Sequence, residues 1–211
     1  IAVYGRTNNE SVDEGSGVIV IPVDGGKSRI VKLPEQGGHL WSYRLSLSPD
    51  GEMLAFSSIE LGKPRSEVSD PHERIIYTIP TKGGEPRKIS SEWARLPSYS
   101  PDGEFIAYVG YSEREDLEKN TNLSRFQGGL WVAPSGGGVP HILASVEGRL
   151  RGPLWSPDCR HIAAHYEPGS SNYSDEIWIY PVSPNATRVG EPEKIRLPGS
   201  SGNMLAGWTP E

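Results

Sequence analysis

The residues best placed to do chemistry are arginines and aromatic residues that recur at fixed distances before a repeated Ser-Pro-Asp motif. Five residues before the motif serine, or before Thr209 in the last copy, stand Tyr43, Arg95, Arg151 and Met204. Seven residues before it stand Trp41, Trp93, Arg149 and Gly202, and Arg44 lies beside the first set. Guanidinium groups next to aromatic rings suit a carboxylate or a peptide side chain. We therefore predict a site that binds a ligand or partner, formed by Arg95, Arg151, Arg149, Arg44, Trp41, Trp93 and Tyr43; the alternative is that the arginines pair with carboxylates of nearby loops.

The aspartates of the same motif, Asp50, Asp102 and Asp158, suit a structural role better than a catalytic one. An aspartate in a Pro-Asp-Gly turn accepts hydrogen bonds from neighbouring backbone N–H groups. Its return once per repeat argues for architecture, so we predict three structural turns. The single cysteine, Cys159, stands where the other two full copies have glycine, and we interpret it as a turn substitution.

Other arrangements that could support catalysis are weak. His161 and His165 lie on a predicted strand, where four steps separate them by roughly 13 Å, too far for one metal ion. The sequence has no Gly-x-Ser-x-Gly nucleophile turn and no Gly-Lys-Ser/Thr phosphate loop. Two acidic clusters lack an established ligand spacing: Asp70, His72 and Glu73, and Glu113, Glu115 and Asp116. We expect no catalytic residue, no metal and no cofactor.

Two alternating motifs predict the elements that carry these residues. An apolar run, a Ser-Pro-Asp-Gly turn and a second apolar run occur at 45–58, 97–110 and 153–166, with a broken copy at 205–211. This pattern is typical of a β-hairpin. A Pro-x-x-Gly-Gly hairpin motif lies between the copies, at 18–26, 76–84, 130–138 and, without its glycines, 177–184. Two hairpins per period of 52–56 residues predict an all-β fold, a β-propeller of four-stranded antiparallel blades.

Each blade should contain four strands in a fixed order. Strand A precedes Ser-Pro-Asp, strand B follows it, strand C contains the Pro-x-x-Gly-Gly motif, and strand D follows the glycines at 28–33, 86–90, 140–143 and 194–197. In a propeller, strand A lines the central channel and strand D is outermost. Arg95 and Arg151 would then lie at the channel mouth, with Trp41 and Trp93 two residues closer to the B–C loops.

The motifs Ser-Pro-Asp-Gly-x-x-Leu/Ile-Ala-Phe/Tyr and Ile-Trp/Tyr-x-x-Pro-x-x-Gly-Gly resemble the WD40-like Pro-Asp repeat of TolB-type β-propellers. The resemblance covers nearly the whole chain, in three good copies and one split copy. It implies the fold but says little about function, because such blades also occur in prolyl-oligopeptidase-like enzymes and in sensor domains of bacterial surface proteins. Rings of this type usually have six blades or more.

We predict one domain over residues 1–211, with one blade split between the termini. Ile1–Gly5 matches a strand B, and the chain ends in a strand A, so Ile1–Gly5 should pair with Gly202–Trp208 in one blade, within one chain or between two chains. The chain would supply about four blades. A larger ring to which it contributes a part, or a homodimer that shares one ring of eight blades, stays open.

The predicted B–C loops are acidic. Residues 5–16, 58–74, 111–128 and 166–176 hold 14 Asp and Glu against 7 Lys and Arg, a net charge of −7, whereas the whole chain has −6. Such a rim would attract cations and basic partners and repel nucleic acid. The alternative is that polar loops only solvate an exposed face. No apolar run of ~18 residues is present, so we expect no membrane insertion.

We predict a non-catalytic scaffold that binds a protein, peptide or ligand. If the resemblance to TolB extends to its role, the protein is periplasmic or on the bacterial cell surface. Two alternatives remain: a propeller enzyme such as a glycosidase or lyase, and the gating propeller of a prolyl-oligopeptidase-like peptidase. A pair of carboxylates within ~5–10 Å in a cleft would favour a glycosidase.

Overall fold

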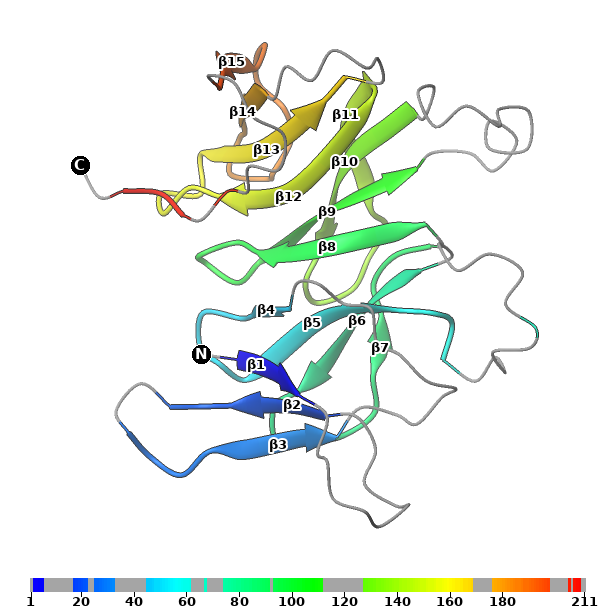
Figure 1. Cartoon of the computed structure of the whole chain (residues 1–211), viewed down its shortest axis with the longest axis vertical. Coiled ribbons are helices and arrows are strands. Elements are labelled where there is room, and N and C mark those ends of the chain that lie inside the picture. Colours follow the sequence, from blue (N-terminus) through cyan, green and yellow to red (C-terminus); the bar gives the residue numbers. More distant parts are fainter. Residues whose placement is uncertain are drawn as a thin grey trace.

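The computed structural model describes residues 2–5, 17–22, 25–32, 45–61, 67, 74–91, 93–111, 127–168, 176–197, 205 and 207–209. These residues form four antiparallel sheets that follow one another along the chain, from the bottom to the top of Figure 1. In every sheet the strands pair in the order of the sequence, which is the meander expected of a propeller blade. We number the blades one to four.

The first blade has three described strands: β1 (Ala2–Gly5), β2 (Gly17–Val20) and β3 (Arg29–Lys32). The second has four: β4 (Ser46–Leu47), β5 (Met53–Ser58), β6 (Ile75–Pro80) and β7 (Arg87–Lys88). The third contains β8 (Ala94–Tyr99), β9 (Phe105–Tyr111), β10 (Gln127–Pro134) and β11 (His141–Glu147). The fourth contains β12 (Arg149–Trp155), β13 (His161–Glu167), β14 (Glu176–Pro181) and β15 (Glu193–Arg196). The predicted propeller of antiparallel blades is confirmed, with four strands described in the second, third and fourth blades, and each predicted strand D overlaps an observed outer strand.

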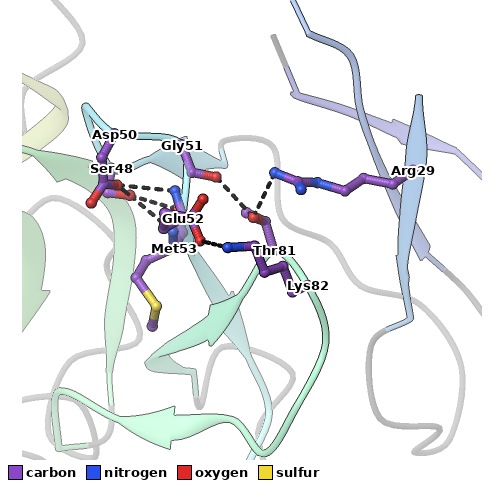
Figure 2. Close-up of polar contacts among 8 residues, drawn as sticks. All are labelled: Arg29, Ser48, Asp50, Gly51, Glu52, Met53, Thr81 and Lys82. Atoms are coloured by element: carbon purple, nitrogen blue, oxygen red, sulfur yellow. Dashed lines mark hydrogen bonds and ion pairs between the residues drawn. The ribbon is translucent and has the colours of Figure 1, made fainter. Parts of the chain in front are cut away.

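The Ser-Pro-Asp turns join strands A and B through one arrangement that recurs in three blades. In the second blade, Ser48 donates its hydroxyl to Asp50, the Glu52 amide donates to Asp50 Oδ1 at 2.9 Å, and the Met53 amide donates to Ser48 Oγ at 2.9 Å (Figure 2). The same bonds recur around Asp102 and around Asp158. The hydrogen bond from Ser48 holds the pKa of Asp50 below its usual value. Each turn therefore satisfies its own backbone donors with a local carboxylate and the motif serine hydroxyl.

Buried apolar side chains fill each junction between successive blades. Val31 of the first blade packs in one cluster with Phe56 and Tyr77 of the second, and Ile76 of the second packs with Ile106 of the third. The junction of the third and fourth blades is the largest cluster and includes Leu130, Val132, Leu150, Trp155, Ile162 and Tyr180. Full burial of such a side chain stabilises the fold by about 1.5–3 kcal/mol. Stability therefore resides mainly between the blades.

A second set of contacts ties the outer strands to the following blade. The third residue after each Gly-Gly pair donates to the C–D turn of the next blade. Arg29 donates to Thr81 Oγ1 at 3.0 Å (Figure 2), and Arg87 donates to the carbonyl oxygens of Ser135 and Gly136, each at 2.7 Å. His141 Nε2 lies 2.9 Å from the carbonyl oxygen of Ala186, completing the series. We call Arg29, Arg87 and His141 the junction donors.

The C-terminal segment lies beside the fourth blade, at the opposite end of the row from the first. Trp208 Nε1 donates to the carbonyl oxygen of Leu154 at 3.4 Å, and its ring lies 6.5 Å from the ring of His161. Figure 1 shows this segment next to β12, with the second and third blades between it and β1. In the described part of the chain, β1 pairs with β2 alone. The described residues of the two terminal segments do not pair within the chain. Ile1, 202–204 and 206 lie outside the described residues, so the blade split between the termini stays a prediction.

Candidate functional site

Of the seven predicted site residues, the structure describes four. Trp93 immediately precedes β8 and Arg95 is its second residue; Arg149 and Arg151 occupy the matching start of β12. These two inner strands contact each other directly. Trp41, Tyr43 and Arg44 lie outside the described residues, as do the two acidic clusters around His72 and Glu115.

The starts of β8 and β12 have the same irregular backbone. The register shifts between Arg95 and Ser98 in β8 and between Arg151 and Leu154 in β12. At the shift, Leu96 has a φ of 57° and Gly152 a φ of 53°. A bulge of this kind turns the strand and re-aims the side chains next to it. Because the bulge recurs, the side chains of Arg95 and Arg151 project from their blades in the same way, each toward the junction that follows its blade.

Arg151 is already paired with a carboxylate. Its Nη2 lies 2.9 Å from Glu167 Oε2, and its side chain is 54% exposed. Opposite Arg151 in the register is His165, which is buried and whose Nδ1 lies 3.9 Å from Glu167 Oε1. The alternative that loop carboxylates pair with the arginines therefore describes Arg151, since Glu167 ends β13 at the B–C loop.

Arg95 has a different environment. It pairs in register with Val109, whose side chain belongs to the cluster between the third and fourth blades, so Arg95 lies on that same face of its sheet. The third-blade equivalent of Glu167, eleven residues after the motif serine, is Tyr111. No carboxylate therefore occupies that place in the third blade. Arg95 Nε is buried and has no hydrogen-bond acceptor among the residues that the structure describes.

Trp93 adds a second donor two residues away. Its side chain is only 8% exposed, and its indole Nε1 is buried without an acceptor in the described part of the molecule. The backbone of Trp93 has a φ of 67°. A non-glycine residue in this left-handed region is strained by about 1–3 kcal/mol, and such residues gather at functional sites. Trp93 and Arg95 thus supply two buried N–H donors at the start of one inner strand.

Arg95 and Arg151 lie at successive junctions. Arg95 faces the junction of the third and fourth blades, whereas Arg151 lies on the opposite face of the fourth blade from Leu150, which is buried in that junction. A common channel mouth that includes Trp41, Tyr43 and Arg44 stays a prediction. So does the acidic rim, because most of its loop residues lie outside the described ranges.

The sequence analysis missed the junction donors and Glu167. The junction donors could have been found, since Arg29, Arg87 and His141 share one position after Gly-Gly. Glu167 had no comparable signal, because the equivalent residues of other blades are not acidic. Within the described ranges, no group of three or more His, Cys, Asp and Glu side chains could hold a metal ion. No helix in those ranges is long and apolar enough to span a membrane.

Comparison with known proteins yields one curated relative and many solved structures. No protein-family model matches the sequence. The chain is 30% identical over 162 residues to the uncharacterized protein Atu1656 of Agrobacterium fabrum, a match that covers 74% of this chain and 40% of that protein. The chain therefore spans well under half of the curated relative's length.

The solved structures agree on the fold. A candidate TolB from Agrobacterium tumefaciens superposes with a TM-score of 0.57 at 15% identity, covering 92% of this chain and 61% of that one. TolB from Acinetobacter baumannii gives 0.55 at 15%, covering 84% and 37%. An oligogalacturonate lyase in complex with manganese gives 0.57 at 18%, covering 90% and 50%, and a prolyl oligopeptidase is also similar. At these identities the likeness establishes architecture alone. The chain has the TolB-like β-propeller fold.

Proposed function

We propose that this chain is a non-catalytic binding propeller that holds an acidic group of a peptide or protein partner beside Trp93 and Arg95. One observation carries the proposal. Two N–H donors, Trp93 Nε1 and Arg95 Nε, are buried at the start of one inner strand without an acceptor among the described residues. Nearly all buried donors in folded proteins have a partner, so this pair calls for one.

The chemistry of the two donors defines the partner group. A guanidinium and an indole N–H both donate and neither accepts, so a group rich in acceptor atoms fits. A carboxylate also neutralises the arginine, and hydrogen bonds between charged groups are roughly twice as strong as neutral ones. An unsatisfied buried donor costs about 1–3 kcal/mol, which an acceptor from the partner would recover on binding.

Arg151 supplies the contrast within the same chain. It occupies the same place in its blade, but Glu167 already lies 2.9 Å from its guanidinium. A partner carboxylate at Arg151 would have to displace this internal acceptor. The proposal therefore assigns the binding role to Arg95 and a structural ion pair to Arg151.

Binding of matched peptides tests this assignment. The probes are two blocked tripeptides, one with a central glutamate and one with a central glutamine, titrated calorimetrically into the protein. We expect the glutamate peptide to bind at least tenfold more tightly, a difference of about 1.4 kcal/mol. Arg95→Ala should remove this preference, and Arg151→Ala should keep it. An unchanged preference in Arg95→Ala, with the melting temperature retained, would move the site elsewhere.

The proposal includes a periplasmic or cell-surface location, which the similarity to TolB supports. A tagged form of the protein, expressed from its own gene and followed through cell fractionation, tests this part separately. Recovery in the cytoplasmic fraction would contradict it and would leave the peptide-binding test unaffected.

A further inference from the structure

Trp178, on β14 of the fourth blade, has three partners from its own blade. The ring of Tyr166 stacks on the indole with the ring centroids 4.3 Å apart. Glu176 Oε2 accepts the indole N–H at 2.9 Å, and Lys194 Nζ lies 4.0 Å from the ring centroid. A stacked ring, an acceptor for the N–H and a cation over the ring are the contacts that suit an indole best. The fourth blade therefore supplies all three for its own tryptophan.

Trp131, on β10 of the third blade, is the repeat equivalent of Trp178 and lacks these three partners. Each tryptophan stands three residues before the proline that ends its strand. The registers of the two blades give the counterparts of Tyr166, Glu176 and Lys194, which are in this order Gly110, Gly129 and Ile142. Trp131 stacks on Tyr108 with the ring centroids 6.4 Å apart, but its Nε1 is buried without an acceptor among the described residues.

The two glycines next to Trp131 are not required by the backbone. Gly110 and Gly129 pair directly in the register of β9 and β10, and neither is among the glycines with a positive φ. The indole of Trp131 is what excludes a side chain at these positions. A Cβ on Gly129 would lie 2.7 Å from Trp131 Nε1, and a Cβ on Gly110 would lie 3.0 Å from Trp131 Cδ1. The edge of the indole thus occupies the space from which a ring and a carboxylate extend in the fourth blade.

The third-blade position differs from the fourth in its charge and polarity. The carboxylate of Glu176 has Arg196, its register partner, 3.8 Å away. The register partner of Gly129 is Ser145, so the outer strand supplies no cation at this point. Ile142, which is 41% exposed, adds apolar surface where the fourth blade has a lysine. A neutral oxygen acceptor carried by an apolar group therefore fits this position better than a carboxylate.

We propose that the third blade binds an aromatic side chain of a peptide at Trp131. The edge of the indole lifts from Gly110 and Gly129, and the ring of the ligand stacks on the indole as Tyr166 does in the fourth blade. A backbone carbonyl oxygen of the ligand then accepts the indole N–H in the place of Glu176. Binding gives a buried donor the acceptor that such groups nearly always have.

This site is separate from the site at Trp93 and Arg95. Trp131 packs against the cluster that contains Ile76, between the second and third blades. Arg95 lies on the opposite face of the sheet, with Val109, toward the fourth blade. An aromatic side chain at Trp131 therefore requires no acidic group in the ligand, and the inference does not depend on the proposed function.

The indole N–H signal of Trp131 tests the proposal directly. Two blocked, uncharged tripeptides, one with a central phenylalanine and one with a central alanine, are titrated into the isotope-labelled 211-residue chain and followed by NMR. The signals of Trp131 and Trp178 are identified by their absence in Trp131→Phe and in Trp178→Phe. We expect the phenylalanine peptide to move the Trp131 signal downfield as the N–H gains an acceptor, at least tenfold more tightly than the alanine peptide. The Trp178 signal should stay in place.

Filling the site from within the chain is the matched variant. Gly110→Tyr combined with Gly129→Glu installs the fourth-blade residues, so the Trp131 signal should move downfield without peptide and the phenylalanine peptide should no longer bind. Arg95→Ala should keep the affinity, because the probe carries no acidic group. Lost binding in Arg95→Ala would place the peptide at the other site and overturn this inference, while leaving the proposed function intact.

Two further results would overturn the inference. The first is a Trp131 signal that stays in place at about 1 mM phenylalanine peptide, a concentration at which even weak recognition is detected. The second is equal affinity for the two peptides, which would mean that no aromatic ring is recognised.

Discussion

The indole nitrogen of Trp208 lies 3.4 Å from the carbonyl oxygen of Leu154. One blade earlier, Trp155 makes the same contact with Ser98 at 3.2 Å. The rings repeat as well, since Trp155 lies 6.4 Å from Phe105 and Trp208 lies 6.5 Å from His161, the repeat equivalent of Phe105. The junction between inner strands is therefore a repeated unit with its own hydrogen bond.

The first prediction concerns this bond. Trp155→Phe keeps a ring in the junction but removes the donor to Ser98, and we expect a loss of about 1 kcal/mol in the free energy of unfolding. Trp208→Phe should cost less, because Trp208 is half-buried whereas Trp155 is only 5% exposed. Urea denaturation of both variants provides the measurement. An equal or larger cost for Trp208→Phe would contradict the expected order.

The second prediction concerns the last position of the Ser-Pro-Asp-Gly turns. Gly103 has a φ of 79°, and a Cβ there would lie 3.3 Å from Pro49 Cδ. Cys159 holds the same position with a φ of 58°, which costs a side-chain-bearing residue about 1–2 kcal/mol. Cys159→Gly should therefore raise the melting temperature, and Gly103→Cys should lower it. Thermal unfolding followed by circular dichroism decides both signs; a destabilised Cys159→Gly would mean that the thiol contact with Asp102 outweighs the strain.

The third prediction is a pH dependence. Burial raises the pKa of Asp102, but hydrogen bonds from Ser100, the Glu104 amide and Cys159 lower it by more, so the folded-state pKa lies below the usual value of an aspartate. A depressed carboxyl pKa contributes stability above the unfolded-state pKa, and that stability is lost as the pH falls through the folded-state pKa. Asp102→Ala should cost about 1 kcal/mol at pH 7, and the difference from wild type should shrink below pH about 4.

Unfolding of both proteins between pH 7 and pH 2 measures this difference. A gap that stays constant across the range would mean that the ionised carboxylate contributes nothing beyond packing. The peptide preference described for Arg95 should survive in Asp102→Ala, because the turn lies at the other end of β8.

The fourth prediction concerns a junction donor. Arg87 donates from two guanidinium nitrogens to the carbonyl oxygens of Ser135 and Gly136. Arg87→Ala should destabilise the protein by about 1–2 kcal/mol, and Arg87→Lys should recover only part, because a single ammonium lacks the planar fork. Lys88→Ala is the matched control, since its ion pair with Glu60 spans 3.9 Å on the surface and contributes little. Full recovery of stability in Arg87→Lys would show that Arg87 acts through its positive charge alone.

The hairpins and the strand order could be predicted because turn chemistry is local. Ser48, Asp50 and the backbone between them complete their hydrogen bonds within five residues. The path of the C-terminal segment could not be predicted, because the repeat specifies the strands of one blade and not the angle between successive blades. Whether Trp208 meets β1 or continues past β12 depends on how every junction packs.

The positions of the candidate site residues could be predicted from the sequence, but their ion-pair partners and backbone conformations could not. Spacing before Ser-Pro-Asp placed Arg95 and Arg151 at matching points of two inner strands. It could not reveal that Arg151 has Glu167 as an acceptor, because the partner lies on a different strand and has no counterpart in the third blade. The left-handed backbone of Trp93 and Leu96 was hidden too, since neither residue type favours that conformation.

A single residue, Gly148, separates β11 of the third blade from β12 of the fourth. It has a φ of 124°, and a Cβ at this point would lie 2.5 Å from the carbonyl oxygen of Glu167. The outer strand of one blade thus passes directly into the inner strand of the next, and this short connection leaves no room for the two blades to separate. Amide protons of β11 and β12 should consequently exchange with solvent through one shared opening event, so that the third and fourth blades behave as one cooperative unit.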